Sequence, residues 1–170
     1  MFKEWKKIVC KPLKIIDMLT GILVIGITLF LIFYWKYIPK QVPQHWNFAG
    51  KIDDYADAGS YIMLVIMMYF FYIAHTLTKL IPMFDWKENL FGKERANKIS
   101  KDVAYQAINT LYAMLWICDF LIQIMCAYII LCGVFVRNLG AWFLPITLGL
   151  MVVDLVWFLI RIMSIKGKVR

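Results

Sequence analysis

The sequence predicts an all-α integral membrane protein, a four-helix bundle of transmembrane helices with both termini in the cytoplasm. Of its 170 residues, 62% are hydrophobic and 16% are aromatic. A soluble domain is about 45–50% apolar, and a small one has too much surface to bury a larger share. Four long apolar runs and a one-sided distribution of Lys and Arg complete the prediction. The length indicates a single domain over residues 1–170.

Four apolar segments match the roughly 20 residues that a helix needs to cross the hydrocarbon core of a bilayer. They are the uncharged Met18–Trp35, then Ala58–Thr78 with His75, Val103–Val136 with Asp119, and Asn138–Ile160 with Asp154. The first segment is longer than a signal-peptide core and no A-x-A-like site follows it, so we expect a retained helix. The predicted helices are about 16–38, 58–81, 103–135 and 139–163, with an outer loop at 39–57 and a cytoplasmic loop at 82–102.

The basic residues that flank these segments predict their orientation, because cytoplasmic flanks are enriched in Lys and Arg. Fourteen lie on one side, at Lys3, Lys6, Lys7, Lys11, Lys14, Lys87, Lys93, Arg95, Lys98, Lys101, Arg161, Lys166, Lys168 and Arg170. Four lie on the other side, at Lys36, Lys40, Lys51 and Arg137. We therefore predict that both termini are cytoplasmic. The net charge of +8 then indicates contact with anionic lipid headgroups.

The outer loop is the most distinctive part of the sequence. Two prolines, Pro39 and Pro43, favour extended backbone at the membrane exit. Asn47 and Gly50 suit a turn, because glycine tolerates positive φ and the asparagine side chain can bond to nearby backbone. The aromatic residues of the loop suit the level of the lipid headgroups. They are Trp46, Phe48 and Tyr55.

Two interpretations of this loop stand side by side. It is either a compact connector that lies back on the mouth of the bundle, or a recognition site in which His45, Asn47 and Asp53 converge on a ligand. In the second interpretation the ligand-binding residues are His45, Trp46, Asn47, Gly50, Asp53 and Tyr55.

The same loop carries the pattern P-x-x-V-P-x-H-W-N-x-x-G-x-x-D-x-Y between Pro39 and Tyr55. This pattern resembles the outer-loop signature of the bacterial SdpI-type immunity family, a small integral-membrane domain of unknown function. A weaker similarity lies at Pro82–Asn89, so the resemblance covers roughly the first hundred residues. Asp57 and Ala58 stand where the family often has a basic residue. The resemblance implies a multi-pass protein of the bacterial cytoplasmic membrane that meets an extracytoplasmic peptide or toxin and a cytoplasmic regulator.

Polar residues inside the predicted spans form a second group of candidates, because such residues are costly in lipid and tend to mark function. They are His75, Lys79, Asp119, Gln123 and Asp154. Their depths overlap at 1.5 Å per residue. They form either a structural ion-pair layer that fixes the helix register, or a proton or ligand site. Both interpretations predict that Asp119 and Asp154 point into the bundle, and that at least one lies within hydrogen-bond reach of His75 or Lys79.

Several classes of function lack support in the sequence. No H-E-x-x-H, G-x-S-x-G or phosphate-binding loop is present, so we predict that the chain is not an enzyme. No nucleic-acid-binding module is visible either. The four cysteines form no C-x-x-C pair and have no histidine at metal-ligand spacing. We therefore expect packing roles for Cys10, Cys118, Cys126 and Cys132, with no disulfide, no metal and no cofactor.

The predicted function follows from the outer loop and its resemblance. We expect a non-enzymatic membrane protein of immunity or signalling type that senses or neutralises an extracytoplasmic molecule, such as a membrane-active peptide. The alternative is a small transporter or proton-coupled membrane subunit that uses the intramembrane His and Asp layer. The sequence leaves the oligomeric state open, including a homo-oligomer.

Overall fold

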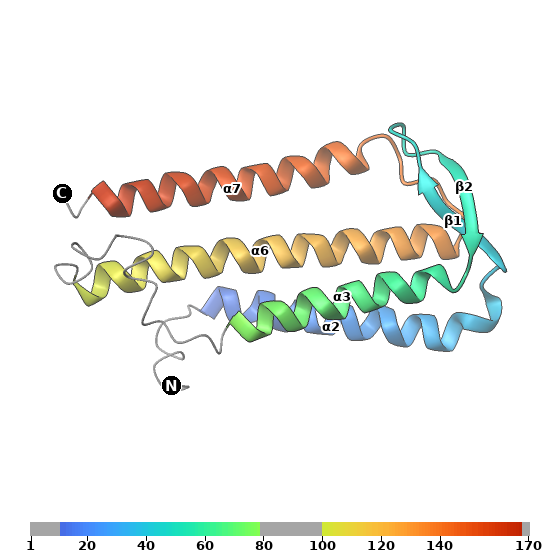
Figure 1. The fold of residues 1–170 in the computed structure, drawn as a ribbon, viewed down its shortest axis with the longest axis horizontal. Helices are drawn as coiled ribbons and strands as arrows, with labels where there is room; N and C mark the ends of the chain where they lie inside the picture. Colours follow the sequence, from blue (N-terminus) through green and yellow to red (C-terminus); the bar gives the residue numbers. More distant parts are fainter. Residues whose placement is uncertain (1–10, 79–99, 168–170) are drawn as a thin grey trace.

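The computed structural model describes residues 11–78 and 100–167, which form four long helices and one β-hairpin (Figure 1). In chain order the elements are α2 (Lys11–Tyr34), the short helix η1 (Trp35–Tyr37), β1 (Gln41–Trp46), β2 (Ile52–Asp57), α3 (Ser60–Thr78), α6 (Lys101–Val134) and α7 (Phe143–Gly167). The predicted cytoplasmic loop lies outside the described residues except for its last three, and Lys79 and Pro82–Asn89 lie outside them entirely.

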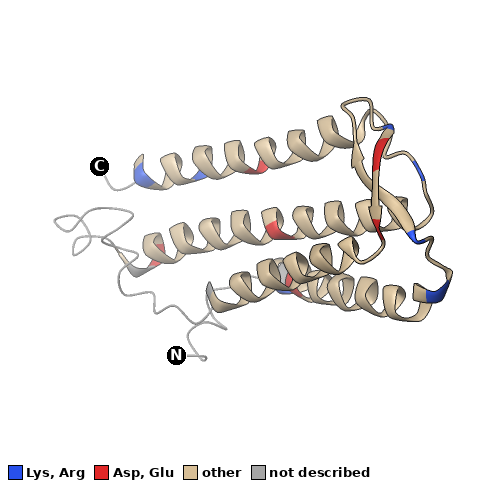
Figure 2. Ribbon diagram, turned by 45° about the vertical axis from the view of Figure 1, so that its right-hand side comes forward, with Lys and Arg blue, Asp and Glu red and all other residues tan. Residues whose placement is uncertain are grey.

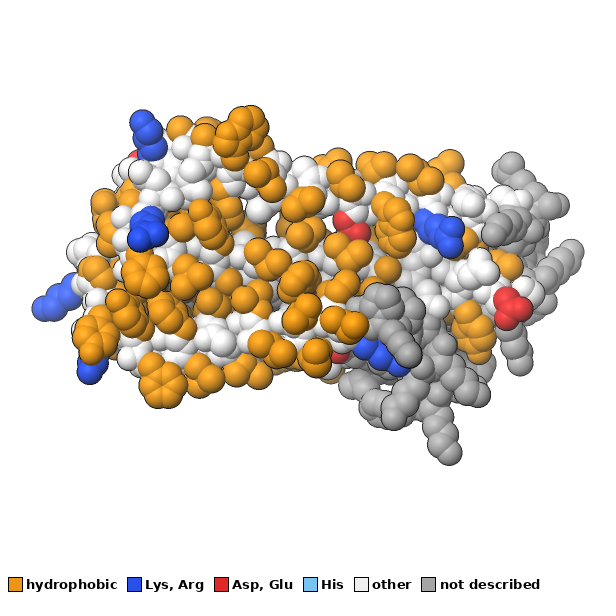
Figure 3. All heavy atoms as spheres, turned by 180° about the vertical axis from the view of Figure 1, so that it is seen from behind, with side chains coloured by type: hydrophobic (Ala, Val, Ile, Leu, Met, Phe, Trp, Pro, Cys, Tyr) orange, Lys and Arg blue, Asp and Glu red, His pale blue; other side chains and the backbone are white. Residues whose placement is uncertain are grey.

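All four helices are long and apolar enough to cross a membrane, which confirms the predicted four-helix membrane fold. On the face seen in Figure 3, hydrophobic side chains cover most of the described surface between the two ends, and the basic side chains lie toward those ends. Many of these apolar residues are more than half exposed, among them Ile32, Phe70 and Val153. Such a surface is stable only in lipid, because water would oppose its exposure.

The bounds of the first and last helices differ from the predicted ones at both ends, since α2 ends at Tyr34 and α7 at Gly167. The helix predicted from about residue 16 begins at Lys11, so Asp17 lies in the second turn of α2 and not at its first residues. The helix predicted from residue 139 begins at Phe143, because Gly140 has a φ of +84° and Pro145 is tolerated only in the first turn. The link between α6 and α7 is therefore longer than expected.

The four helices do not share one core. Helices α2, α3 and α6 pack together around Val24, Met68 and Ile130. Helix α7 packs mainly against α6 (Figure 1). Only three of the 25 residues of α7 are buried, namely Asp154, Ile162 and Ile165. The structure is thus a three-helix unit with a fourth helix held along one side.

The outer loop is a two-stranded antiparallel hairpin that caps the bundle at the end away from the start of α2 and the end of α7 (Figure 1). The register pairs Gln41 with Asp57 and Trp46 with Ile52, with an irregularity around His45. The expected extended backbone and the turn at 47–50 are both present. The strand pairing was not predicted, because β1 and β2 lack a clean alternation of apolar and polar residues.

We expect the hairpin end to face out, because the flanking basic residues are concentrated at the opposite end. Charged positions of the described residues occur at both ends of the ribbon and at a few places along the helices (Figure 2). A cysteine at the exposed Lys51 should react with a membrane-impermeant thiol reagent on intact cells, and one at the exposed Lys166 should not. Labelling of Cys10 or of the Lys166→Cys variant on intact cells would refute this orientation.

Candidate functional site

Tyr61, in the first turn of α3, joins the hairpin to the bundle. Its hydroxyl donates a hydrogen bond of 2.6 Å to the carbonyl oxygen of Pro43 on β1. Its ring lies against Gly133 of α6, where an added Cβ would overlap the hydroxyl group. Tyr61 is 2% exposed. The base of the hairpin is therefore fixed by a buried hydrogen bond that needs a glycine beneath it.

The tip of the hairpin is fixed to the link between α6 and α7. The carbonyl oxygen of Gly50 accepts a hydrogen bond of 2.9 Å from the backbone N–H of Leu139. Gly50 has a φ of +69°, and an added Cβ would overlap the backbone of Gly140. The indole N–H of Trp46 donates a hydrogen bond of 3.1 Å to the carbonyl oxygen of Arg137. Gly50 and Trp46, predicted as ligand-binding residues, thus hold the hairpin in place.

Asn47 shapes the turn, as the sequence suggested. Its Oδ1 accepts hydrogen bonds from the backbone N–H groups of Ala49, at 2.9 Å, and Lys51, at 3.2 Å. This oxygen therefore bonds within the turn. Asn47 therefore stabilises the turn. Of the three residues expected to converge on a ligand, the structure brings His45 and Asp53 together.

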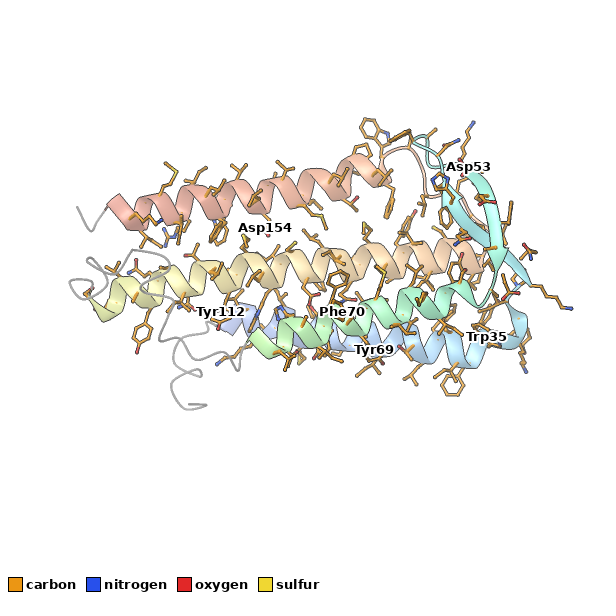
Figure 4. The ribbon with its side chains drawn as sticks, in the orientation of Figure 1. Trp35, Asp53, Tyr69, Phe70, Tyr112 and Asp154 are labelled. Atoms are coloured by element: carbon orange, nitrogen blue, oxygen red, sulfur yellow. The ribbon has the colours of Figure 1, made fainter. Side chains whose placement is uncertain are left out.

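His45 and Asp53 meet across the two strands. Nδ1 of His45 lies 2.6 Å from Oδ1 of Asp53, with the two side chains 67% and 39% exposed. Asp53 lies at the hairpin end of the molecule (Figure 4). Tyr55, the last residue of the predicted set, is 49% exposed. His45 and Asp53 form an accessible polar pair, which is the part of the predicted site that remains free to meet a ligand.

An apolar groove of about 480 Å³ lies beneath the hairpin. Its floor comes from α6, its walls from α3 and the start of α7, and its roof from β1 and the turn. Residues around it include His45, Met63, Met67, Met125, Phe143 and Leu144. Because α3 and α7 do not pack extensively against each other, the groove is open toward the surrounding lipid. The sequence did not predict this groove, since its lining comes from separate segments of the chain.

A second constellation lies within the membrane, where α2, α3 and α6 meet. His75 is 3.7 Å from Asp17 through Nε2 and 3.9 Å from Asp119 through Nδ1. Gln123, with no exposed surface, donates hydrogen bonds from Nε2 to Oδ1 of Asp119 and to the carbonyl oxygen of Met68. Both distances from His75 are within the range of an ion pair but are too long for a direct hydrogen bond.

Asp17 is the member of this constellation that the sequence did not predict. It stands one residue before the uncharged run, so it was not counted among the polar residues inside the spans. The helix begins six residues earlier, at Lys11, which carries Asp17 into the bundle. The available signal was the need of His75 for a partner on each ring nitrogen, because an intramembrane ionisable group is costly alone.

Asp154 lies apart from this constellation. It is 7% exposed and lies on the side of α7 that faces α6 (Figure 4). No ion pair or hydrogen bond involves its side chain within residues 11–78 and 100–167. The predicted polar layer is therefore present only in part. It contains His75, Asp119 and Gln123, and Asp17 belongs to it in place of Asp154. Asp119 and Asp154 are both buried, and a hydrogen bond from Lys79 to either of them stays a prediction.

One known family matches part of the chain. Residues 22–69 match the family described as Domain of unknown function (DUF1648). This segment runs from within α2 through the hairpin to the middle of α3, and it includes all six predicted ligand-binding residues. The match is consistent with a small membrane-protein family. No curated protein and no solved structure matches the chain.

Proposed function

We propose that this chain is a non-enzymatic bacterial membrane protein of immunity or signalling type that captures a membrane-active peptide at the outer surface of the cytoplasmic membrane. The groove beneath the hairpin is the observation that carries the proposal. It has the volume of a ligand site, at about 480 Å³, and it opens where an amphipathic molecule lies in the bilayer. The resemblance of the hairpin to the SdpI-type signature supports the same class.

The chemistry of the groove suits an amphipathic peptide. Met63, Met67 and Met125 provide flexible, polarizable walls that adapt to different apolar side chains. His45 contributes a polar edge, and its partner Asp53 carries an accessible carboxylate that a cationic residue could contact. A peptide would thus place its apolar side chains in the groove and its charges at the hairpin. A cytoplasmic regulator would read the bound state.

The test is protection of cells against a panel of membrane-active peptides. Met67→Trp fills the groove from α3, whereas Ile66→Trp adds the same bulk to an exposed neighbour that does not line it. Met67→Trp should reduce protection about tenfold, the change that a loss of about 1.4 kcal/mol in binding gives. Ile66→Trp should protect like the unmodified chain. Equal protection by both variants would exclude the groove as the binding site.

The polar pair at the edge of the groove gives a second measurement. Asp53→Ala removes the carboxylate that meets His45 and should weaken protection without lowering expression. Asp54→Ala is the matched control, because Asp54 bonds only to the N–H of Tyr55 among the described contacts. If the chain protects against no peptide in the panel, the proposal is wrong.

A second candidate function rests on the polar constellation within the membrane. A histidine between two carboxylates, Asp17 and Asp119, is an arrangement found in proton relays of transporters. The alternative is therefore a small transporter or proton-coupled subunit. The stability and activity of two Asp119 variants, described in the Discussion, distinguish this transport function from a structural role of the constellation.

A further inference from the structure

The α6–α7 seam, the line along which these two helices pack, is buried at one end and partly exposed in its middle. Toward the cytoplasmic end, Ile162 and Ile165 pack with Ala107 in a buried apolar cluster. Around Asp154 the neighbouring position on α6, Cys118, is only half-buried. Leu150 and Trp157, which share a helix face with Asp154, are 48% and 43% exposed. The middle of α7 therefore presents a surface that the described part of this chain leaves uncovered.

Asp154 lies largely beneath that surface, with 7% of its area exposed, and holds a carboxylate at membrane depth. It stands eleven residues after Phe143, the start of α7, which is about 17 Å at 1.5 Å per residue. This is near the middle of a hydrocarbon core of about 30 Å. Ionisable residues at such depth pair with an opposite charge or a hydrogen-bond partner. The described residues supply neither to Asp154.

The described helices of a second copy do not offer the missing cation. Lys36 of η1 lies at the hairpin end. Within α2, α3, α6 and α7, the described Lys and Arg residues lie only near the ends away from the hairpin. They are Lys11, Lys14, Lys101, Arg161 and Lys166. The nearest in sequence, Arg161, lies seven residues from Asp154, which is about 10 Å along the helix axis. A parallel copy would therefore place its basic residues well below the carboxylate.

We propose that Asp154 pairs with a Lys or Arg carried near the centre of a membrane-spanning helix of another protein. That helix packs along the α6–α7 seam, with apolar side chains over Leu150 and Trp157. Charge complementarity selects the partner, because an uncompensated carboxylate favours a helix with a cation at the same depth. The inference does not rest on the outer groove, whose residue Leu144 lies ten residues, about 15 Å, from Asp154.

The test uses the full chain in lipid nanodiscs and a dye-labelled synthetic helix of about 20 Leu and Ala residues. The helix carries one central Lys, and a second version carries Gln there. The unmodified chain should bind the Lys helix about tenfold more tightly than the Gln helix, a ratio typical of strong polar contacts between membrane helices. Asp154→Asn should bind both equally. Asp102→Asn, which removes an exposed carboxylate at the start of α6, should keep the preference.

Three results would overturn the proposal. The first is equal binding of the two helices by the unmodified chain. The second is a preference for the Lys helix that survives in Asp154→Asn. The third is a preference for the Lys helix that is absent in the unmodified chain and present in Lys79→Gln, which would show that Lys79 already pairs with Asp154. Asp154→Lys gives a second measurement, because it should prefer a helix with a central Glu.

Discussion

Gly50→Ala is expected to detach the tip of the hairpin from the bundle. The residue has a φ of +69°, which L side chains rarely adopt, and a Cβ there would overlap the backbone of Gly140. Backbone cannot move aside as a flexible side chain can, so the hydrogen bond from Leu139 would be lost as well. We expect a loss of at least about 2 kcal/mol of stability, and more for Gly50→Val. Thermal unfolding in detergent and hydrogen exchange of the hairpin amides measure it.

Gly149→Ala is the matched control for this substitution. Gly149 lies on α7 with nothing within 4 Å of an added Cβ, so alanine there should be neutral or slightly stabilising. Equal melting temperatures for the two variants would show that the hairpin tip is not fixed to the link at 137–140. A Gly50→Ala variant as stable as the unmodified chain would also show that the hairpin is not a rigid roof for the proposed groove.

Asp119→Leu is expected to lower the folded yield strongly. The carboxylate accepts a hydrogen bond from Gln123 and faces His75 at 3.9 Å. Leucine would remove one of the two hydrogen bonds that the buried amide of Gln123 donates, and also the carboxylate beside His75, at a cost of about 2–4 kcal/mol. Asp119→Asn should cost less than about 1 kcal/mol, because an amide oxygen still accepts the hydrogen bond. Size-exclusion profiles and thermal unfolding of both variants give the comparison.

The same pair of variants separates the two candidate functions. If the cluster is structural, Asp119→Asn should fold and keep the protective activity. If the chain is a proton-coupled transporter, Asp119→Asn should fold and lose activity, since an amide does not carry a proton at neutral pH. Asp102→Leu serves as the control, because Asp102 is exposed at the start of α6. A fully stable Asp119→Leu variant would contradict both roles for this carboxylate.

The membrane fold was predictable because a transmembrane helix is a local property. Each helix satisfies its own backbone hydrogen bonds and needs only about 20 apolar residues, so the run around Val24 identifies a span without any knowledge of its neighbours. The turn at Asn47 and Gly50 was predictable for the same reason, since Asn47 bonds to backbone within four positions and the positive φ of Gly50 is a property of that residue alone. The pairing of the two strands was not, because their residues do not alternate in polarity.

For the candidate sites too, local features were predictable from the sequence and contacts between distant segments were not. The sequence by itself determined that His45 and Asp53 lie in one segment between two spans and that His75, Asp119 and Asp154 lie inside membrane spans. Only the tertiary structure decided that Trp46 bonds to Arg137, 91 positions away, and that Asp17 completes the partners of His75. It also decided that α7 stands to one side, which separates Asp154 from the other carboxylates. The physical reason is that lipid removes the difference in hydrophobicity between the inside and the outside of a bundle. An apolar helix face then carries no signal of which neighbour it meets, and the contacts are selected by packing and polar pairing between helices.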